Sequence, residues 1–498
     1  MKEPTTADGR TVSRRNYLKL GAGTALSLPL AGCFGFGDDS ATDMSGSPSD
    51  GSSLTIIKDG TLVPVDPDVG VQEHADVLIE DGEIVEIADT IDEADAEIVD
   101  ASDAIVLPGF VNSHLHTWQA SVRGTTGDWT FSEYLELMLG DVSSRYEPED
   151  AYLGNLFGAV EQLHTGTTTV LDWFHIANSP DHTDRAIDGL EDAGIRSVFA
   201  HGPPGDDGDT WWEASTEPHP SDIERLHDER FPANDGLVTL AMGIRGPDYA
   251  TDEVVEDDIT LGRELDIPIS MHIGSLGPGG IYNLEELDLL GSDLNYVHGN
   301  RFEQEEFELI GDSGGSISIT PEVEMQMGMG MPVLGEAIAA GATPTLGVDI
   351  TSNVSGEMFT QMRMALQAQR ALDNQPAVER NEQIESVSLD ARRALELATI
   401  EGARALGMED RIGSITPGKR ADIVLLRTDD ITTAPVHDPV ETAVFQAGTS
   451  TVDTVLVDGR IVKQDGVVHN KAIETHWSAF EQSGADIIDE SVVEPERP

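Results

Sequence analysis

The stretch Leu107–Gly124, LPGFVNSHLHTWQASVRG, places two histidines at the end of an apolar, strand-like segment that is interrupted by a Pro-Gly pair. In a strand, residues i and i+2 face the same side, so His114 and His116 point the same way, roughly 6–7 Å apart along the backbone. Two imidazoles in this arrangement are suited to bind one metal ion. Two polar residues in an ordinary turn would give the same pattern, so the rest of the chain has to decide.

The central part of the chain alternates strand-like segments with helix-like segments such as AYLGNLFGAVEQLHTG and EQEEFELIGDSGG. This alternation predicts a parallel sheet, and eight repeats predict an α/β fold of the (β/α)8 barrel type. The eight predicted strands are Ile105–Val111, Thr168–Trp173, Arg196–His201, Val238–Ile244, Ile269–Ile273, Leu294–His298, Ser316–Thr320 and Thr343–Val348.

Histidines and one aspartate lie at or just after the ends of these predicted strands. In a (β/α)8 barrel the active site is built at the C-terminal ends of the strands, so such residues are expected to meet. A capping or surface histidine is the ordinary alternative for any one of them, but it does not explain the whole set. The set comprises His114, His116, His175, His201, His272, His298 and Asp349.

Short strands with turn signals flank the expected barrel at residues 107–411. Residues 54–106 contain SLTIIKDGTLVPVD and DVLIEDGEIVEIAD, in which Asp-Gly separates apolar runs and indicates hairpins. Residues 412–470 contain similar segments, GKRADIVLLRTD and VDTVLVDGRIVKQDG. We expect both ends to combine into one small β-sandwich, and residues 471–498 to form an acidic C-terminal tail.

The composition indicates a folded protein with an acidic surface. The 498 residues carry 92 Asp and Glu against 29 Lys and Arg, a formal net charge of -63. The recurring apolar segments argue against an acidic disordered chain. Charge of this sign is typical of salt-adapted proteins such as those of halophilic archaea, and it disfavours binding to nucleic acid. The single cysteine, Cys33, excludes an internal disulfide.

The N-terminal segment reads as an export signal. Arg14 and Arg15 precede a short apolar run from Leu20 to Leu30, which is too short to span a bilayer as a helix. The paired arginines resemble a twin-arginine signal, and Leu-Ala-Gly-Cys resembles a lipobox ending at Cys33. We therefore expect a lipoprotein signal over residues 1–33, a flexible tether over 34–53, and a protein held by its lipid on the extracellular face of the membrane.

The chain resembles the metal-dependent amidohydrolase superfamily. The resemblance rests on PGFVNSHLH followed by RG, on the strand-end His, His and Asp, and on ARALGMEDRIGSITPGKRADIVLL near the C-terminus, and it covers roughly residues 54–465. The branch it is most similar to contains cytosine, guanine and adenosylhomocysteine deaminases and triazine chlorohydrolases. The resemblance implies metal ligands at His114, His116, His272 and Asp349, with His298 beside the metal or facing the substrate.

A single divalent metal is expected. Some members of this superfamily bridge two metals with a carbamylated lysine, but none of the six lysines of this chain lies in the expected barrel. Imidazole and carboxylate ligands favour Zn²⁺, with Fe²⁺ or Mn²⁺ as alternatives. The implied reaction is attack by a metal-bound hydroxide on a carbon that carries nitrogen, with Asp349 taking the proton of the water and His298 stabilising the developing charge.

One position departs from the deaminase pattern. A glutamate that shuttles protons normally follows the fifth-strand histidine by three residues, and here that position holds Ser275. We expect another carboxylate to replace it. Glu324, in SITPEVEMQMG, is the preferred candidate and Glu357 a weaker one, although a surface glutamate is common in so acidic a chain.

Residues 117–165 form a long insertion after the first strand, and its aromatic residues are expected either to cap the site or to belong to the core. The methionines of MQMGMGMP, from Met325, would add an apolar wall. Arg245, at the end of the fourth strand, is a candidate partner for an anionic or carbonyl group. The aromatic residues concerned are Trp118, Trp129, Phe131 and Tyr134.

These observations favour a hydrolase of non-peptide C–N bonds, deaminase-like and acting on an N-heterocyclic or amidine substrate. Dechlorination, amine removal and cyclic amide opening remain alternatives within the same class. A lipid-anchored binding protein with weak or lost catalysis is the alternative from another class, and Ser275 is the residue that supports it. We expect a small-molecule substrate, with a homodimer as an option.

Overall fold

The computed structural model describes residues 54–205 and 209–488 of the chain. The expected signal at 1–33, the tether at 34–53 and the last residues of the expected tail, 489–498, lie outside the described residues. Among the described residues, no helix is both long and apolar enough to cross a membrane.

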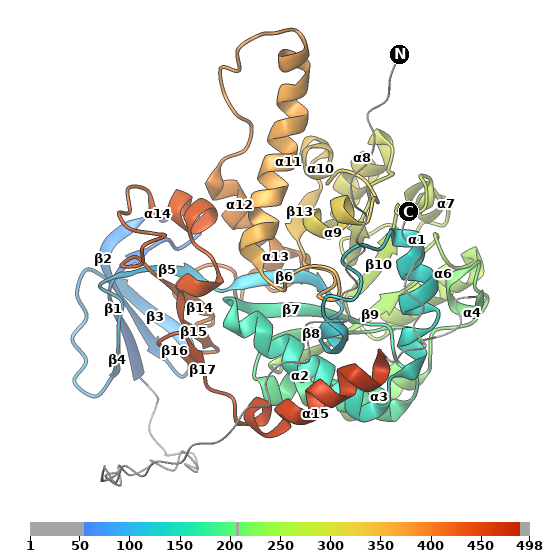
Figure 1. Cartoon of the computed structure of the whole chain (residues 1–498), viewed down its shortest axis with the longest axis horizontal. Coiled ribbons are helices and arrows are strands. Elements are labelled where there is room, and N and C mark those ends of the chain that lie inside the picture. The colour runs from blue at the N-terminus through green and yellow to red at the C-terminus, as the bar shows by residue number, and fades with distance from the viewer. Residues whose placement is uncertain (1–53, 206–208, 489–498) are drawn as a thin grey trace, which may run out of the picture. The chain divides into compact units, whose positions relative to one another are not determined.

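Eight parallel strands of the described chain form the barrel, each hydrogen-bonded to its neighbours in sequence order (Figure 1). Their residues are almost all buried, because helices cover the outside and side chains fill the inside. The predicted barrel is therefore confirmed. The strands are β6 Phe110–Leu115, β7 Thr167–Phe174, β8 Arg196–His201, β9 Val238–Ile244, β10 Ile269–Ile273, β11 Leu294–His298, β12 Ser316–Ile319 and β13 Thr343–Leu346.

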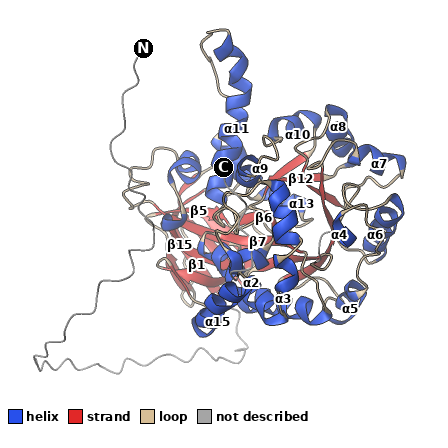
Figure 2. Ribbon diagram, turned by 45° about the vertical axis from the view of Figure 1, so that its right-hand side comes forward, coloured by secondary structure: helices blue, strands red, loops and turns tan. Residues whose placement is uncertain are grey.

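Helices surround the barrel strands (Figure 2). Local sequence sets their ends: α2 begins with Pro148 at its first turn, and left-handed glycines such as Gly194 and Gly314 terminate α3 and α8. The helices are α2 Pro148–His164, α3 Pro180–Ala193, α4 Asp209–Trp212, α5 Asp222–Glu229, α6 Asp252–Glu264, α7 Gly280–Glu286, α8 Gln304–Ser313, α9 Pro321–Gln326, α10 Leu334–Ala340, α11 Met358–Glu379, α12 Ala391–Leu397 and α13 Ile400–Ala405.

The barrel closes between its first strand and the segment after its last. The Asp349 amide donates to the His114 carbonyl at 3.0 Å, and the His116 amide donates to the Asp349 carbonyl at 2.8 Å. The Asn112 side chain adds a bond from the Val348 amide at 3.1 Å. A side chain at Gly347 would stand 2.8 Å from the His114 carbonyl oxygen, so only glycine allows this approach.

The interior of the barrel contains a polar layer. Ser318 donates to Ser113 at 2.9 Å, and Asn295 donates to Ser318 and accepts from Ser270, each at 3.0 Å. All four side chains are buried. Their mutual bonds satisfy groups that would otherwise cost free energy to bury, and they join strands β6, β10, β11 and β12 across the barrel.

Both ends of the chain contribute to a second, mixed sheet that encloses its own core. Strand β1 pairs with β2, β4 and β5, so the sheet branches at this strand. Strand β14, from the C-terminal part, pairs antiparallel with β5 from the N-terminal part. The strands are β1 Leu54–Leu62, β2 Gln72–Glu80, β3 Glu83–Ala88, β4 Glu97–Asp100, β5 Ala104–Pro108, β14 Ile423–Arg427, β15 Val452–Val457, β16 Arg460–Gln464 and β17 Val467–Val468.

The prediction of one barrel strand over Ile105–Val111 was wrong. The chain leaves the mixed sheet after β5 and enters the barrel as β6. Gly109 lies between them, its amide bound to the Asp422 carbonyl at 2.9 Å, and a side chain there would overlap Thr168. One apolar run thus serves two sheets.

A buried ion pair also joins the sheet to the barrel. Arg196, at the start of β8, donates to Asp422 at 2.8 and 3.1 Å and to Asp458 at 3.0 Å. The side chains of Arg196 and Asp422 are each 2% exposed. Because a buried charge without its partner is costly, this pair resists separation of the two sheets.

Residues Lys471–Ile487 of the expected tail form helix α15, which packs against α2. The Phe157 and Phe480 rings stack with centroids 4.0 Å apart, and Ser483 donates to Asp150 at 2.6 Å. The acidic side chains of this segment therefore lie on the outer face of an amphipathic helix. Short helical turns precede it at α14 Pro439–Glu441, η5 Thr442–Gln446 and η6 Thr449–Thr451.

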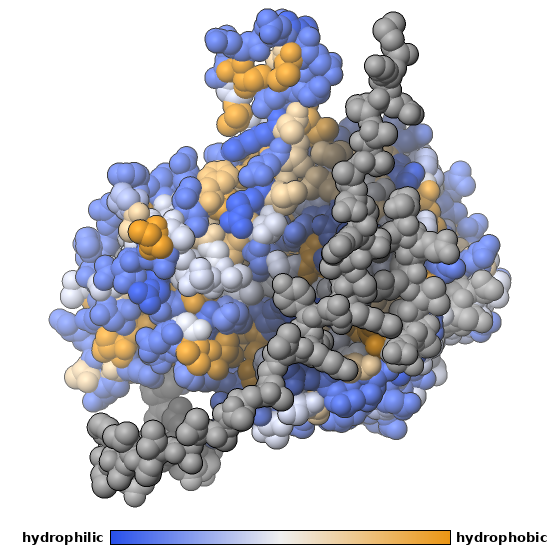
Figure 3. All heavy atoms as spheres, viewed as in Figure 1, coloured by the Kyte–Doolittle hydropathy of each residue, from blue (hydrophilic) through white to orange (hydrophobic). Residues whose placement is uncertain are grey.

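The visible surface is largely hydrophilic (Figure 3). Arginines are held by several carboxylates at once: Arg230 lies within 3.1–3.4 Å of Asp184, Asp188 and Glu191. Such clusters reduce the mutual repulsion of the acidic side chains locally, although each exposed pair adds little stability.

Candidate metal centre

Side chains from three parts of the barrel meet at the C-terminal ends of its strands. His114 lies in β6 and His116 directly follows it, His272 lies in β10, and Asp349 follows β13. Nε2 of His272 lies 3.2 Å from Nε2 of His114. Oδ1 of Asp349 lies 3.4 Å from Nε2 of His114 and 3.5 Å from Nε2 of His116. The structure thus brings together the four residues that the sequence predicted as ligands.

Two overlapping groups of possible metal ligands meet here: His114 with His116 and Asp349, and His114 with His272 and His298. Bonds of about 2.0–2.1 Å in a tetrahedron place neighbouring ligand atoms about 3.3–3.4 Å apart. The separations of 3.4 and 3.5 Å within the group of His114, His116 and Asp349 match that value, and His272 approaches this group through His114 at 3.2 Å. Three imidazoles and a carboxylate are also a donor set that divalent metals prefer. The chemistry of the four side chains, and the spacing within the group of His114, His116 and Asp349, therefore fit a divalent cation.

The imidazoles are prepared to act as ligands. His116 donates from Nδ1 to the Trp173 carbonyl at 2.6 Å, which leaves the lone pair of Nε2 free. Burial lowers the pKa of His116 to about 3, with a further contribution from His114, and it holds the pKa of His114 and His272 well below the usual range. Neutral rings with free Nε2 atoms are the state that binds metal.

Asp349 adopts a backbone conformation that is rare for a residue with a side chain. Its φ of 72° lies in the left-handed region, as does the φ of 79° at His298. The bonds to β6 that close the barrel hold Asp349 in this conformation. Burial raises the pKa of the Asp349 carboxyl, and the neighbouring imidazoles of His298 and His116 oppose that shift. A cation at this position would offset the cost of the buried carboxylate.

His298 and Glu324 form a buried pair behind Asp349. Nε2 of His298 lies 4.0 Å from Oδ2 of Asp349, and its Nδ1 lies 3.4 Å from Oε1 of Glu324. The same Glu324 oxygen accepts from the Thr320 amide at 2.9 Å. Burial alone would lower the pKa of His298, but the bond to Glu324 and the charge of Asp349 raise it overall.

Glu324 does not line the pocket, so it does not occupy the place of the missing glutamate. Ser275 is buried, and its hydroxyl has no hydrogen-bond partner among the described residues. Glu357, the weaker candidate, caps α11 through the Thr360 amide at 3.0 Å. Asp248, which sequence reasoning missed, lies beside Ser275. Burial raises the pKa of Asp248 to about 6, although hydrogen bonds from the 274–276 backbone lower it in part.

The pocket over these residues is nearly filled, with about 30 Å³ of cavity. That volume holds one or two waters, and no organic substrate. Phe131 and Tyr134 of the long insertion and Trp212 of α4 line it. Substrate entry therefore requires these segments to move. The insertion contains η2 Thr117–Val122, α1 Phe131–Glu133, the π-helical η3 Tyr134–Leu139 and η4 Val142–Arg145.

The aromatic residues of the insertion were expected either to cap the site or to belong to the core, and each alternative holds for some of them. Phe131 and Tyr134 line the pocket, whereas Trp129 is buried in the core. Trp118 is buried as well, but its indole donates to Nδ1 of His175 at 3.0 Å, and His175 lines the pocket. From the methionine-rich stretch, Met327 and Met329 form part of the apolar wall.

Two other strand-end residues do not join the centre. His201 contacts His219 through Nδ1 at 2.9 Å in a buried cluster outside the pocket. Arg245 is 1% exposed and binds Asp258 at 3.2 Å and Ser215 at 2.7 Å. Arg245 therefore supports the loop before α5 and does not meet an anionic substrate group.

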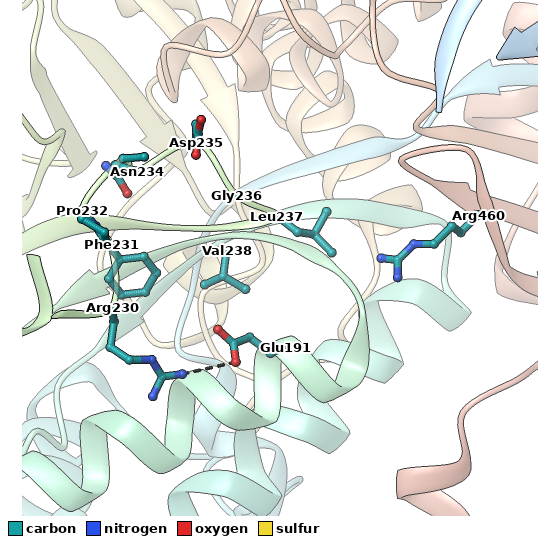
Figure 4. A pocket seen from close by; sticks show the side chains of 11 residues that line it. Glu191, Arg230, Phe231, Pro232, Asn234, Asp235, Gly236, Leu237, Val238 and Arg460 are labelled. Carbon is teal, nitrogen blue, oxygen red and sulfur yellow. Dashed lines mark hydrogen bonds and ion pairs between the residues drawn. The ribbon is translucent and has the colours of Figure 1, made fainter. Parts of the chain in front are cut away.

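A second cavity, of about 520 Å³, lies at the N-terminal start of β9 (Figure 4). Arg230 bonds to Glu191 across it, and Arg460 stands at its other side. Its lining has no cluster of metal ligands: among the described residues, the groups of three or more possible ligands all contain His114. The chemistry of the protein is thus located at the opposite, C-terminal end of the strands.

A (β/α)8 barrel that gathers three histidines and an aspartate at its strand ends defines the class of metal-dependent barrel hydrolases. The model of the amidohydrolase family matches residues 105–462, which is most of the chain. The chain therefore belongs to the amidohydrolase family, and it is a metal-dependent hydrolase of C–N bonds.

Curated relatives are deaminases of nucleoside derivatives. The chain is 29% identical over 412 residues to a 5'-deoxyadenosine deaminase of Methanothermobacter thermautotrophicus, covering 80% of this chain and 91% of the relative. It is 28% identical over 429 residues to a 5-methylthioadenosine/S-adenosylhomocysteine deaminase of Carboxydothermus hydrogenoformans, covering 83% and 94%.

Solved structures with the same fold carry zinc. An adenosine deaminase from Xanthomonas campestris with bound zinc is 25% identical, with a TM-score of 0.75 over 87% of this chain and 98% of that one. The zinc complex of an atrazine chlorohydrolase from Arthrobacter aurescens is 24% identical, with a TM-score of 0.76 over 86% and 100%. The latter likeness concerns the fold.

Removal of one ligand should abolish metal binding. We expect His272→Ala to retain less than about a tenth of the metal that the unchanged protein keeps after dialysis, because one of four ligands is lost. Metal content is measured by inductively coupled plasma mass spectrometry. His201→Ala is the matched control, since His201 is also a buried strand-end histidine and should keep its metal. Equal loss in both variants would contradict the assignment.

The pH dependence of stability tests the contact of Asp172 with Thr117, which follows the ligand His116 in the chain. It accepts from the Thr117 amide at 3.1 Å and from Asn155 at 2.7 Å, and burial raises its pKa to about 7. Because the folded pKa exceeds the unfolded value of about 3.9, its contribution is full below pH 4 and is lost as pH rises through about 7. The melting temperature of Asp172→Asn, which lacks this titration, should rise relative to the unchanged protein between pH 5 and pH 8. A constant difference would contradict this account.

Proposed function

We propose that this protein uses a single zinc ion to deaminate an N-heterocyclic or amidine substrate. The observation that carries the proposal is that His114 belongs to two groups of possible metal ligands, one with His116 and Asp349 and one with His272 and His298, with the His298–Glu324 pair beside Asp349. This arrangement supplies a metal site, a carboxylate and a second buried imidazole at one place, which is what hydrolysis of a C–N bond requires.

Each side chain of the chain has a distinct role in the proposal. The metal, when bound, supplies Lewis acidity that lowers the pKa of a water molecule. Asp349 would help to hold the metal through Oδ1, which lies 3.4 and 3.5 Å from Nε2 of His114 and His116, and its carboxylate would take up a proton from the attacking water. His298 reaches the same side of the site through Nε2, where it stabilises negative charge that develops on the attacked group.

Glu324 is a positioning residue in this scheme. It accepts from Nδ1 of His298 and is itself held by the Thr320 amide. A carboxylate that accepts from Nδ1 fixes the ring orientation and directs Nε2 towards Asp349, in the manner of a carboxylate that orients a catalytic histidine.

Zinc is the preferred metal because three imidazole nitrogens and one carboxylate oxygen match its tetrahedral preference. The bound zinc of the Xanthomonas structure supports the same choice. Iron(II) and manganese(II) use similar ligands but favour higher coordination numbers than the four side chains here supply.

Ser275 favours a second candidate reaction. Ammonia leaves a heterocycle only after protonation, whereas chloride leaves without it, so a site that lacks the usual glutamate is less restricted for dechlorination. The fold likeness to a chlorohydrolase is compatible with this option. Asp248, a buried carboxylate that accepts from the 274–276 backbone, would restore a proton supply for deamination only on reaching the pocket, which it does not line.

Turnover provides the direct test. The purified protein, assayed in high salt against heterocyclic amines and amidines, should release ammonia that disappears with a chelator and returns with zinc. Asp349→Asn should lower kcat by at least about 10³-fold, since it removes a ligand and the proton acceptor together. Asp228→Asn, at an exposed carboxylate, is the control. Chloride release without ammonia would favour the second candidate, and stoichiometric zinc with neither product would contradict both.

We also propose that the chain is exported by the twin-arginine route and anchored through a lipid on Cys33, in a salt-adapted cell. Only the sequence supports this, through Arg14, Arg15 and the Leu-Ala-Gly-Cys segment. Replacing both arginines by lysine should keep the protein inside the cell, and Cys33→Ala should move it from the membrane fraction to the soluble fraction. Immunoblots of cell fractions measure both. A membrane-bound Cys33→Ala variant would overturn the lipid anchor.

A further inference from the structure

The ring of His116 is held by more than its hydrogen bond. Nδ1 donates to the Trp173 carbonyl at 2.6 Å, and this single bond fixes the direction of Nδ1 but not the plane of the ring. The His175 ring lies parallel on one face of the His116 ring, with centroids 3.9 Å apart and an interplanar angle of 8°. A ring stacked at this distance leaves no room for His116 to tilt towards it. His175 thus supplies a constraint that the hydrogen bond does not.

His175 is itself fixed by its neighbours. Its Nδ1 accepts from the Trp118 indole at 3.0 Å, and an indole N–H can only donate, so the hydrogen of the neutral His175 ring is on Nε2. The rings of Trp118 and Trp173 meet the His175 ring edge-on, with centroids 5.3 and 5.4 Å away and interplanar angles of 65° and 78°. The hydrogen bond and these ring contacts together leave His175 one orientation.

Trp118 belongs to a part of the insertion that is packed firmly on the barrel helices. A side chain at Gly154 of α2 would stand 2.5 Å from the Trp118 carbonyl oxygen, so η2 and α2 are in direct backbone contact. The Tyr146 ring meets the Trp118 ring edge-to-face with centroids 4.8 Å apart. Trp118 is buried and does not line the pocket. Its position is therefore independent of the movement that admits a substrate.

We propose that Trp118 and His175 are positioning residues for the metal ligand His116. The indole holds the His175 ring, and the stacked His175 ring holds His116 in the plane that directs the lone pair of Nε2 at the centre, where Nε2 lies 3.5 Å from Oδ1 of Asp349. The inference rests on the metal binding of the proposed function and not on the reaction. An imidazole binds a metal along its in-plane lone pair, so a tilted ring binds more weakly, and contacts behind a ligand typically contribute about 10- to 100-fold in affinity.

The affinity of the purified protein for Co²⁺ tests the proposal without turnover. His175→Ala and Trp118→Phe should each raise the Kd for Co²⁺ about tenfold, measured by competition with a chromophoric chelator. His201→Ala and Trp129→Phe are the matched controls and should leave the Kd unchanged, because both residues are buried outside the pocket and outside the ligand groups. If all four variants bind Co²⁺ equally well, the positioning role is wrong.

A double-mutant cycle separates positioning from general loosening of the site. Trp118 acts on the centre only through His175, so Trp118→Phe should raise the Kd about tenfold in the unchanged protein and have no effect in a His175→Phe background, where no acceptor for the indole remains. The same factor in both backgrounds would show a merely structural indole and overturn the proposal. Should Trp118→Phe fail to fold, His175→Phe decides: an unchanged Kd contradicts the proposal, and a tenfold rise that His201→Phe does not share supports it.

The visible spectrum of the Co²⁺-loaded protein reports the arrangement of the ligands, because band position and intensity depend on coordination geometry. At saturating Co²⁺, Trp118→Phe should shift the band, whereas Trp129→Phe should not. An unshifted band in both variants would count against the proposal. If the unchanged protein binds neither Co²⁺ nor Zn²⁺, the proposed function fails together with this inference. Tight binding that none of the Trp118 and His175 variants alters contradicts this inference alone.

Discussion

The hydrogen bonds that close the barrel are the constraint on which the site depends. The Asp349 backbone accepts from the His116 amide and donates to the His114 carbonyl, so the last ligand is attached to the strand that carries the first two. Gly347 permits the approach, and the left-handed φ of Asp349 turns its carboxylate towards the imidazoles. The hydrogen bonds that close the barrel therefore also set the position of the last ligand. A chain in which β13 has not docked has no complete metal site.

Most of the barrel was predictable because its strands are buried on both faces and form continuous apolar runs. The expected bounds Arg196–His201, Val238–Ile244, Ile269–Ile273 and Leu294–His298 agree with β8 to β11. The first barrel strand was not predictable, because the break at Gly109 is imposed by the close approach of Thr168, which lies far away in the sequence. The polar layer inside the barrel was also hidden, since single serines in an apolar run do not reveal which partners they meet.

The predicted ligands came together because their position at strand ends, visible in the sequence, determines where they lie in a barrel. The direction of Glu324 was not visible, because it depends on the Thr320 amide and on a histidine 26 residues away. Within the insertion, the sequence alone does not distinguish the role of Trp118 from that of Tyr134. Their different roles follow from the π-helical register of η3 and from contacts with His175 and Gln119. Arg245 was expected to face a ligand, but a charged group that finds an internal partner is satisfied there.

The small volume of the closed pocket has a consequence for time as well as for shape. A cavity of about 30 Å³ is too small for an organic molecule, so a ligand enters only when the wall moves. Movement of η3 and the Trp212 segment therefore precedes binding, and its frequency sets an upper limit on the rate of capture. Rates of capture of chemically different ligands should thus share one upper limit set by the protein, while their rates of release remain their own.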